Sequence, residues 1–344
     1  MVRAFALASA AASLLAACAP VAVDAPSRAV GNPDGTLFVA AKRGASLSRI
    51  DLATGEETHR ADTCENPHEL TLSPDEQHVM VACYSGHTLE VFQTPDLFVN
   101  GKVSLGEGAR VHSALWLEGG RVIAGAEGRG SLYVIGLRMM DGNMPPIMSQ
   151  GEIAGSAPGP HLLAVAPDRK TAWGTIIPRG EVVRYDLESR KETARRRVGN
   201  AIEAIAISPD GESLWVASNE DSVAYRLDPA TLETRAEVAT GEVPIRLAMH
   251  PSGRWVVSSN YGSGDLSVID TATNEVVRTI PVSGSREAVQ VTLIFNEDGT
   301  RLYAAETGTD TVAEVDFASG RVLRRIATGE GGDGLAIVTG TPAQ

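Results

Sequence analysis

The chain has 344 residues, a formal net charge of −13 and a pI of about 5.0. This acidity argues against nucleic acid as a partner, and against adhesion to anionic lipid by charge, because both need a basic surface. The length suffices for one large all-β domain or for two ordinary domains.

The N-terminal residues have the features of an export signal. A basic start is followed by an apolar run, residues 4–15, that is too short to span a bilayer. The quartet Leu15-Ala16-Ala17-Cys18 resembles the bacterial lipobox, which implies cleavage before Cys18 and lipid on its thiol. We therefore expect a signal peptide at 1–17, a lipidated tether at 18–29 and a folded domain at 30–340. The alternative is an ordinary secretory signal that contains a cysteine.

The lipid on Cys18 would hold the protein to a membrane of the cell envelope, since several acyl chains on one cysteine anchor stably. We expect it in the periplasm or on the outer membrane. Ala19, which follows Cys18, favours the outer membrane because it is not an acidic retention signal.

A repeat of 41 to 49 residues runs through the rest of the chain. Its turn anchors fall at positions 33, 74, 118, 167, 209, 251 and 297, as the segments Ile205–Gly211 (IAISPDG) and Leu247–Gly253 (LAMHPSG) illustrate. Each unit holds four short apolar runs separated by tight turns and no helical stretch. This pattern predicts an all-β fold, a seven-bladed β-propeller of four-stranded antiparallel blades.

The segment Leu266–Val282 (LSVIDTATNEVVRTIPV) resembles the repeat of the YVTN-type seven-bladed propellers. The resemblance extends over about residues 30 to 340 and implies the fold, whereas it says little about activity. The first unit lacks its opening run, and Gly334–Val338 supplies a surplus one. We therefore expect the C-terminal strand to close the ring in the first blade. Residues 136–158 are expected to form a projecting loop inserted between the third and fourth blades.

One repeat position, six residues before the anchor, carries polar side chains in four consecutive blades. They are His68, His112, His161 and Glu203, and the closing strand would add Asp333 in the first blade. Equivalent positions lie at one height around the channel of a propeller, so these side chains should converge. Three imidazoles and a carboxylate suit a divalent transition metal such as Cu or Zn. The alternative is a set of hydrogen-bonded histidines at a solvated entrance.

Two cysteines remain beside Cys18, and in an oxidising compartment Cys64 and Cys83 are expected to form a disulfide. The alternative is a metal site of both cysteines and His68. The same face of the propeller should also collect four further polar residues: His87, Glu127, Asn260 and Glu306.

The sequence contains none of the common catalytic signatures, such as Gly-x-Ser-x-Gly or His-Glu-x-x-His. We expect a monomeric binding module whose channel mouth takes a metal, a small molecule or a protein partner. One alternative is a metal-dependent enzyme of the lactonase, lyase or oxidase type, with the three histidines as ligands and Glu203 as ligand or base. The other is a structural or assembly factor of a periplasmic pathway.

Overall fold

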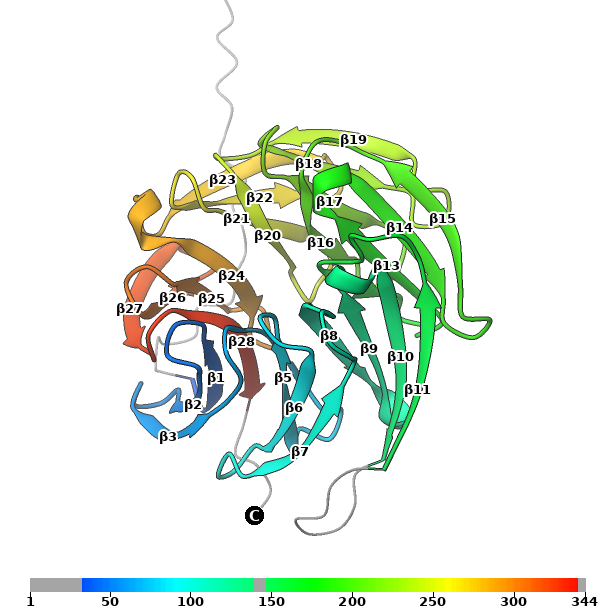
Figure 1. Cartoon of the computed structure of the whole chain (residues 1–344). Coiled ribbons are helices and arrows are strands. Elements are labelled where there is room, and N and C mark those ends of the chain that lie inside the picture. Colours follow the sequence, from blue (N-terminus) through cyan, green and yellow to red (C-terminus); the bar gives the residue numbers. More distant parts are fainter. Residues whose placement is uncertain (1–32, 139–146, 340–344) are drawn as a thin grey trace, which may run out of the picture. The chain divides into compact units, whose positions relative to one another are not determined.

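The structure, a computed structural model, describes residues 33–138 and 147–339, and these form seven sheets of four antiparallel strands around a channel (Figure 1). The predicted seven-bladed propeller is therefore confirmed. The predicted signal peptide and tether, together with Cys18, lie outside the described residues. Among the described residues, no helix is long and apolar enough to cross a membrane.

The blades are numbered one to seven along the chain, and their strands run from the channel outward. Blade one holds β28 (Gly332–Thr339), β1 (Gly35–Ala41), β2 (Ser46–Asp51) and β3 (Glu57–Asp62); blade two holds β4 (Pro67–Leu72), β5 (His78–Cys83), β6 (Thr88–Gln93) and β7 (Val99–Ser104); blade three holds β8 (Val111–Leu117), β9 (Arg121–Ala126), β10 (Ser131–Arg138) and β11 (Ile147–Ala154). Blade four holds β12 (Leu163–Val165), β13 (Thr171–Ile176), β14 (Glu181–Asp186) and β15 (Lys191–Arg197); blade five holds β16 (Ile202–Ile207), β17 (Leu214–Ser218), β18 (Val223–Leu227) and β19 (Thr234–Ala239). Blade six holds β20 (Pro244–Met249), β21 (Trp255–Asn260), β22 (Asp265–Asp270) and β23 (Glu275–Pro281); blade seven holds β24 (Gln290–Phe295), β25 (Arg301–Glu306), β26 (Thr311–Asp316) and β27 (Arg321–Ala327).

The repeated turn joins the first two strands of a blade. In blade five, the amide of Gly211 donates to the carbonyl of Ser208 at 2.9 Å, and Gly211 has φ +76°. Glycine adopts this left-handed conformation without the steric cost that other residues have. The hydroxyl of Ser208 donates to Asp210 Oδ1 at 2.5 Å and holds the turn. The Ser-Pro-Asp-Gly pattern is thus a direct sequence signature of the hairpin.

The hydrophobic core is divided among the spaces between neighbouring blades. Seven clusters of buried side chains fill these spaces, for example the one that joins Met80 and Val91 of blade two to Val122 and Tyr133 of blade three. The second strand of a blade is therefore buried on both faces, whereas outer strands such as β3 are exposed. Each blade depends on both neighbours for its core.

The C-terminal strand closes the ring, as predicted. β28 pairs with β1 in antiparallel register, with Leu37 opposite Ile337, and forms the innermost strand of blade one. The prediction for residues 136–158 was wrong in part. Residues 131–138 and 147–154 pair over eight positions as the outer hairpin of blade three, because the backbone groups of β10 need a partner strand there. Residues 139–146 lie outside the described residues.

Candidate functional site at the channel mouth

A β-bulge begins the innermost strand of the blades. In blade five, Ile202 pairs with Ser218 and Ala204 with Ala217, so that Glu203 has no opposite residue. Comparable shifts occur at the same place in blades one, two, three, six and seven, and in blade four the backbones of His161 and Leu162 both bond to Thr175. The bulges contain one repeat position, which we call the first ring: Asp333, His68, His112, His161, Glu203, Ile245 and Val291. Bulges redirect side chains and are frequent beside functional sites.

A second ring follows the second strand of each blade: Lys42, Tyr84, Glu127, Ile177, Asn219, Tyr261 and Thr307. In six blades, the amide of this residue donates to the carbonyl of a residue with positive φ, two positions before the first ring. Tyr84 bonds in this way to Asn66 at 3.3 Å, and Tyr261 to Val243 at 2.9 Å. The repeated bond fixes the two rings relative to each other.

The three histidines of the first ring lie against one another. The ring centroids of His68 and His112 are 4.7 Å apart, and those of His112 and His161 are 3.6 Å apart. Tyr84 of the second ring packs on His68 at 4.6 Å and on His112 at 5.3 Å. All three histidines are less than a tenth exposed. Symmetry-related bulges therefore create a buried aromatic and imidazole cluster.

Two carboxylates enclose the third imidazole. His161 Nδ1 lies 3.4 Å from Glu127 Oε2, and His161 Nε2 lies 3.5 Å from Glu203 Oε1, where it forms no hydrogen bond. Glu203 also accepts hydrogen bonds from Asn219 at 2.5 Å and from Arg246 at 2.8 Å. Arg246 in turn reaches Glu69 at 2.9 Å. Arg246 of blade six thus pairs with carboxylates of blades two and five.

These surroundings separate the pKa values of the imidazoles. Burial lowers the pKa of His68 to about 4, with Lys42 adding to the effect, and it lowers that of His112 well below its ordinary value. Burial also acts against a charge on His161, but the carboxylates of Glu127 and Glu203 outweigh it and raise the pKa. For Glu203, burial is outweighed by His161 and Arg246, which bring the pKa to about 2. These surroundings therefore favour the charged form of His161 and the neutral forms of His68 and His112.

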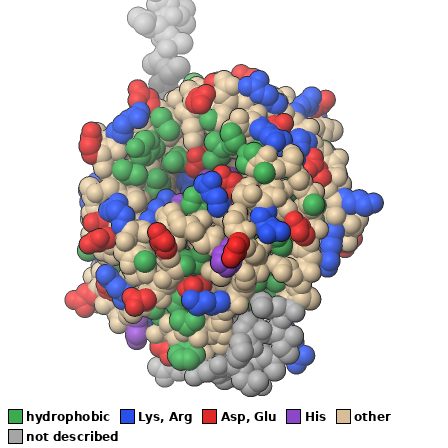
Figure 2. Space-filling model, viewed as in Figure 1, with side chains coloured by type: hydrophobic (Ala, Val, Ile, Leu, Met, Phe, Trp, Pro, Cys, Tyr) green, Lys and Arg blue, Asp and Glu red, His purple; other side chains and the backbone are tan. Residues whose placement is uncertain are grey.

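The rest of the mouth divides into a charged and an apolar sector. In blade one, buried Asp333 lies 2.9 Å from Lys42 Nζ. In blades six and seven, the two rings contribute Ile245, Tyr261 and Val291, which pack in one hydrophobic cluster. Figure 2 shows one face of the protein, hollowed near its centre, with hydrophobic, basic and acidic side chains around the hollow.

The structure brings together His68, His112, His161, Glu203, Glu127 and Asp333 among the predicted site residues. The other residues predicted for this face, His87, Asn260 and Glu306, have contacts outside the histidine cluster. Asn260 bonds within blade six to Asp265 and Ser267, and Glu306 pairs with Arg325 at 2.7 Å in blade seven. His87 lies between β5 and β6, where its carbonyl accepts from Leu105.

The predicted cysteine pair is a disulfide in the structure, with Cα atoms 5.8 Å apart. It links the segment before His68 to the residue before Tyr84, and thereby ties the two rings of blade two together. In the described part of the chain, the only three potential ligands whose atoms lie within 4.8 Å of one another are Cys64, Cys83 and Glu90. Because the two sulfurs are bonded to each other, this group is not a metal site. The nitrogens of the three histidines do not lie close enough together to form a metal site by themselves.

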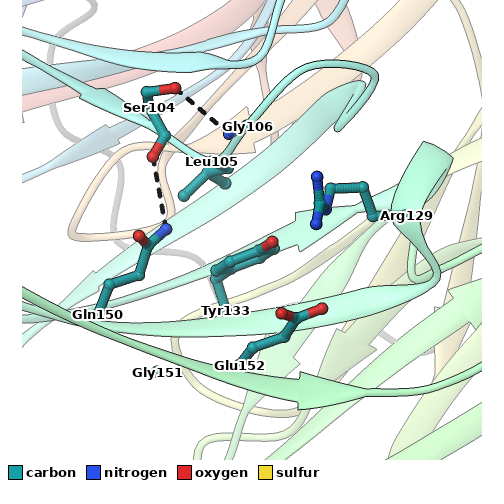
Figure 3. Close-up of a pocket in the computed structure, with 8 residues that line it drawn as sticks. All are labelled: Ser104, Leu105, Gly106, Arg129, Tyr133, Gln150, Gly151 and Glu152. Carbon is teal, nitrogen blue, oxygen red and sulfur yellow. Dashed lines mark hydrogen bonds between the residues drawn. The ribbon is translucent and has the colours of Figure 1, made fainter.

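A separate open hollow of about 440 Å³ lies between blades two and three, away from the rings (Figure 3). Figure 3 shows Tyr133 between Arg129 and Gln150, with Gln150 Nε2 donating to the carbonyl of Ser104 at 3.5 Å. None of the predicted site residues lines this hollow.

Several residues of the site were not predicted from the sequence. Arg246 and Glu69 come one residue after the first ring, so a search of that single repeat position passes them by. Lys42 and Tyr84 belong to the second ring, whose members share no residue type. A comparison of every position that flanks the second strands would have found them.

The fold and the site define this protein as a seven-bladed β-propeller with an imidazole- and carboxylate-lined channel mouth. Residues 177–331 match the family model of the Cytochrome D1 heme domain, over less than half of the chain. Among curated proteins, the chain is similar to the Dihydro-heme d1 dehydrogenase of Pseudomonas aeruginosa, with 27% identity over 206 residues, which are 54% of this chain and 40% of that protein. YncE of Escherichia coli O157:H7 is 23% identical over 167 residues, 44% of this chain and 47% of that protein.

The matches span less than half of the length of these curated relatives. Among solved structures, Kuenenia stuttgartiensis hydrazine synthase has a TM-score of 0.69 at 16% identity, covering 87% of this chain and 98% of that one. The Dihydro-heme d1 dehydrogenase NirN in complex with DHE has a TM-score of 0.65 at 13% identity, covering 90% of this chain and 76% of that one. At these identities the structural likeness shows the propeller fold alone.

Proposed function

We propose that this protein is a binding propeller whose channel mouth takes a heme-type macrocycle, with His68 as the ligand to its metal. Two similarities support the class of ligand: the match of residues 177–331 to a family named for its heme domain, and the likeness to a dehydrogenase named for dihydro-heme d1. The observation in the site that carries the proposal is the hydrogen bond of His68 Nδ1 to the carbonyl of Asn66, which leaves Nε2 free to bind a metal.

His68 has the features of a prepared metal ligand. Its Nδ1 lies 3.0 Å from the carbonyl of Asn66, and since a carbonyl only accepts, Nδ1 carries the proton. This leaves the lone pair on Nε2, and the pKa of about 4 keeps it free at neutral pH. A bond from the other ring nitrogen to a backbone carbonyl is the usual support of a metal-bound histidine.

The other parts of the mouth fit the same kind of ligand. Ile245, Tyr261 and Val289 are partly exposed and apolar, and they offer contact surface to a large flat ring system. Arg246 and Lys42 pair with the buried carboxylates, which weakens their repulsion of an anionic ligand. When bound, such a macrocycle would supply a metal centre for ligand binding or electron transfer.

Spectroscopic titration tests the proposal. Addition of iron protoporphyrin IX to the purified chain should give a saturable shift of the Soret band, typical of a histidine-bound iron. The His68→Ala variant should lose this shift, because it removes the proposed ligand nitrogen, Nε2. The matched control is His59→Ala, which changes an exposed histidine on β3.

Absence of a saturable shift in the wild-type chain, or equal binding by the His68→Ala variant, would contradict the proposal. Stoichiometric uptake of Cu or Zn without any macrocycle binding would instead favour a simple metal site.

We also propose that the protein works in the cell envelope, held by lipid on Cys18. The lipobox-like quartet supports this, and a disulfide between Cys64 and Cys83 suits an oxidising compartment. Labelled palmitate should enter the wild-type protein in cells and should not enter the Cys18→Ala variant. Labelling that persists in this variant would disprove anchoring at Cys18.

A further inference from the structure

We infer that two arginine-capped tyrosines, Tyr84 with Arg110 and Tyr261 with Arg286, bind the carboxylates of a planar anionic ligand at the channel mouth. The inference deepens the proposed function and rests on it: it makes the ligand a free-acid macrocycle and names the residues that select it. The two pairs belong to different sides of the channel, since their tyrosines come from blades two and six.

The two pairs are built in the same way. Each tyrosine is a second-ring residue, and each arginine comes from the segment that enters the following blade. The guanidinium carbon of Arg110 lies 4.7 Å from the ring centroid of Tyr84, and that of Arg286 lies 5.5 Å from the centroid of Tyr261. Stacking on an aromatic face pre-orders a guanidinium, which lowers the entropy cost of binding.

These arginines still have donors to offer. The cations inside the mouth already form ion pairs: Lys42 with Asp333, and Arg246 with Glu69 and Glu203. Within the described residues, Arg110 forms no ion pair within 4 Å, and it donates to the hydroxyl of Tyr84. Among the described residues, the ion pair recorded for Arg286 within 4 Å is with the exposed Glu242, at 3.9 Å. Such a contact is weak in water, so a ligand carboxylate can displace it.

Both tyrosines connect the arginines to the ligand-binding surface. Tyr84 packs on His68, the proposed metal ligand, and Tyr261 packs in one hydrophobic cluster with Ile245 of the apolar sector and with Val289. A flat ligand that meets His68 and this sector would therefore place its edges beside the two guanidinium groups. Guanidinium binds carboxylate with paired, charge-assisted hydrogen bonds, which fixes orientation as well as affinity.

The test compares iron coproporphyrin III, whose four propionates are spread around the ring, with its tetramethyl ester, which has no free carboxylate. Dissociation constants are measured from the Soret band for the wild-type chain and for Arg110→Ala and Arg286→Ala. Each substitution should weaken binding of the free acid by about tenfold, which corresponds to about 1.4 kcal/mol, and should change binding of the ester by less than about twofold. Arg235→Ala, on the outer strand β19, is the matched control and should affect neither ligand.

Arg110→Lys and Arg286→Lys should restore part of the affinity for the free acid, since they keep the charge but lose the paired geometry. The inference is overturned if both ligands are weakened equally, or if the free acid binds the alanine variants as it binds the wild type. If His68-dependent binding of the free acid persists in these cases, the proposed function stands and only the clamp is wrong. If neither macrocycle binds the wild-type chain, both fail.

Discussion

At the scale of single residues, three histidines at one repeat position have different chemistry. His68 and His112 are buried beside cations or other imidazoles, which favours their neutral forms. His161 differs because Glu127 and Glu203 lie on both sides of its ring. The ring centroids of His112 and His161 are 3.6 Å apart, so positive charges on both imidazoles would repel each other strongly. The environment therefore favours the neutral forms of His68 and His112, whereas the two carboxylates favour the charged form of His161.

The lowered pKa of His68 predicts a dependence of stability on pH. Because the unfolded chain binds a proton at His68 below about pH 6.5 and the folded chain only below about pH 4, stability should fall as the pH drops through this window. One proton contributes about 1.4 kcal/mol per pH unit. Urea unfolding at pH 4.5, 5.5 and 6.5 should therefore show a shallower pH slope for His68→Gln than for the wild type.

The matched control for this measurement is His59→Gln at the exposed strand β3, which should keep the wild-type slope. A wild-type slope in the His68→Gln variant would show that His68 does not titrate differently in the folded and unfolded chains. Glu203 acts in the same direction over a lower window: its contribution is present above about pH 4.5 and is lost toward pH 2.

At the scale of elements, the sequence predicts what each blade repeats. The Ser-Pro-Asp-Gly turn, the apolar runs and the surplus C-terminal run led to the right blade number and ring closure, because each reflects a local backbone or burial requirement. The column of His68, His112 and His161 was predictable for the same reason, since the bulge recurs at one repeat position.

The remaining features depend on contacts that no repeat encodes. Arg246 was missed because its partners come from other blades: Glu203 from the neighbouring blade five, and Glu69 from blade two on another side of the channel. The outer hairpin of blade three was missed because β11 lacks an alternating pattern and is defined by its pairing with β10. Asn260 and Glu306 were predicted to share the face of the site, and their side chains bond within their own blades.

At the scale of the whole molecule, the site and the ring depend on the same strand. β28 completes blade one, covers the edge of β1 and carries Asp333, the partner of Lys42. Its side chains also join the cores that blade one shares with blades two and seven. Without β28, β1 would expose an unpaired edge, and two blade interfaces would lose apolar contacts.

Removal of β28 should therefore destabilise the entire propeller, and not only blade one. We expect a chain that ends at Gly331 to melt well below the full-length protein, or to aggregate, because an open ring leaves strand edges and core side chains in water. The control is a chain that ends at Thr339, which keeps all of β28 and should melt like the full-length protein. Thermal unfolding followed by circular dichroism distinguishes the two chains. An unchanged melting temperature for the shorter chain would mean that the other strands hold the ring without its closing strand.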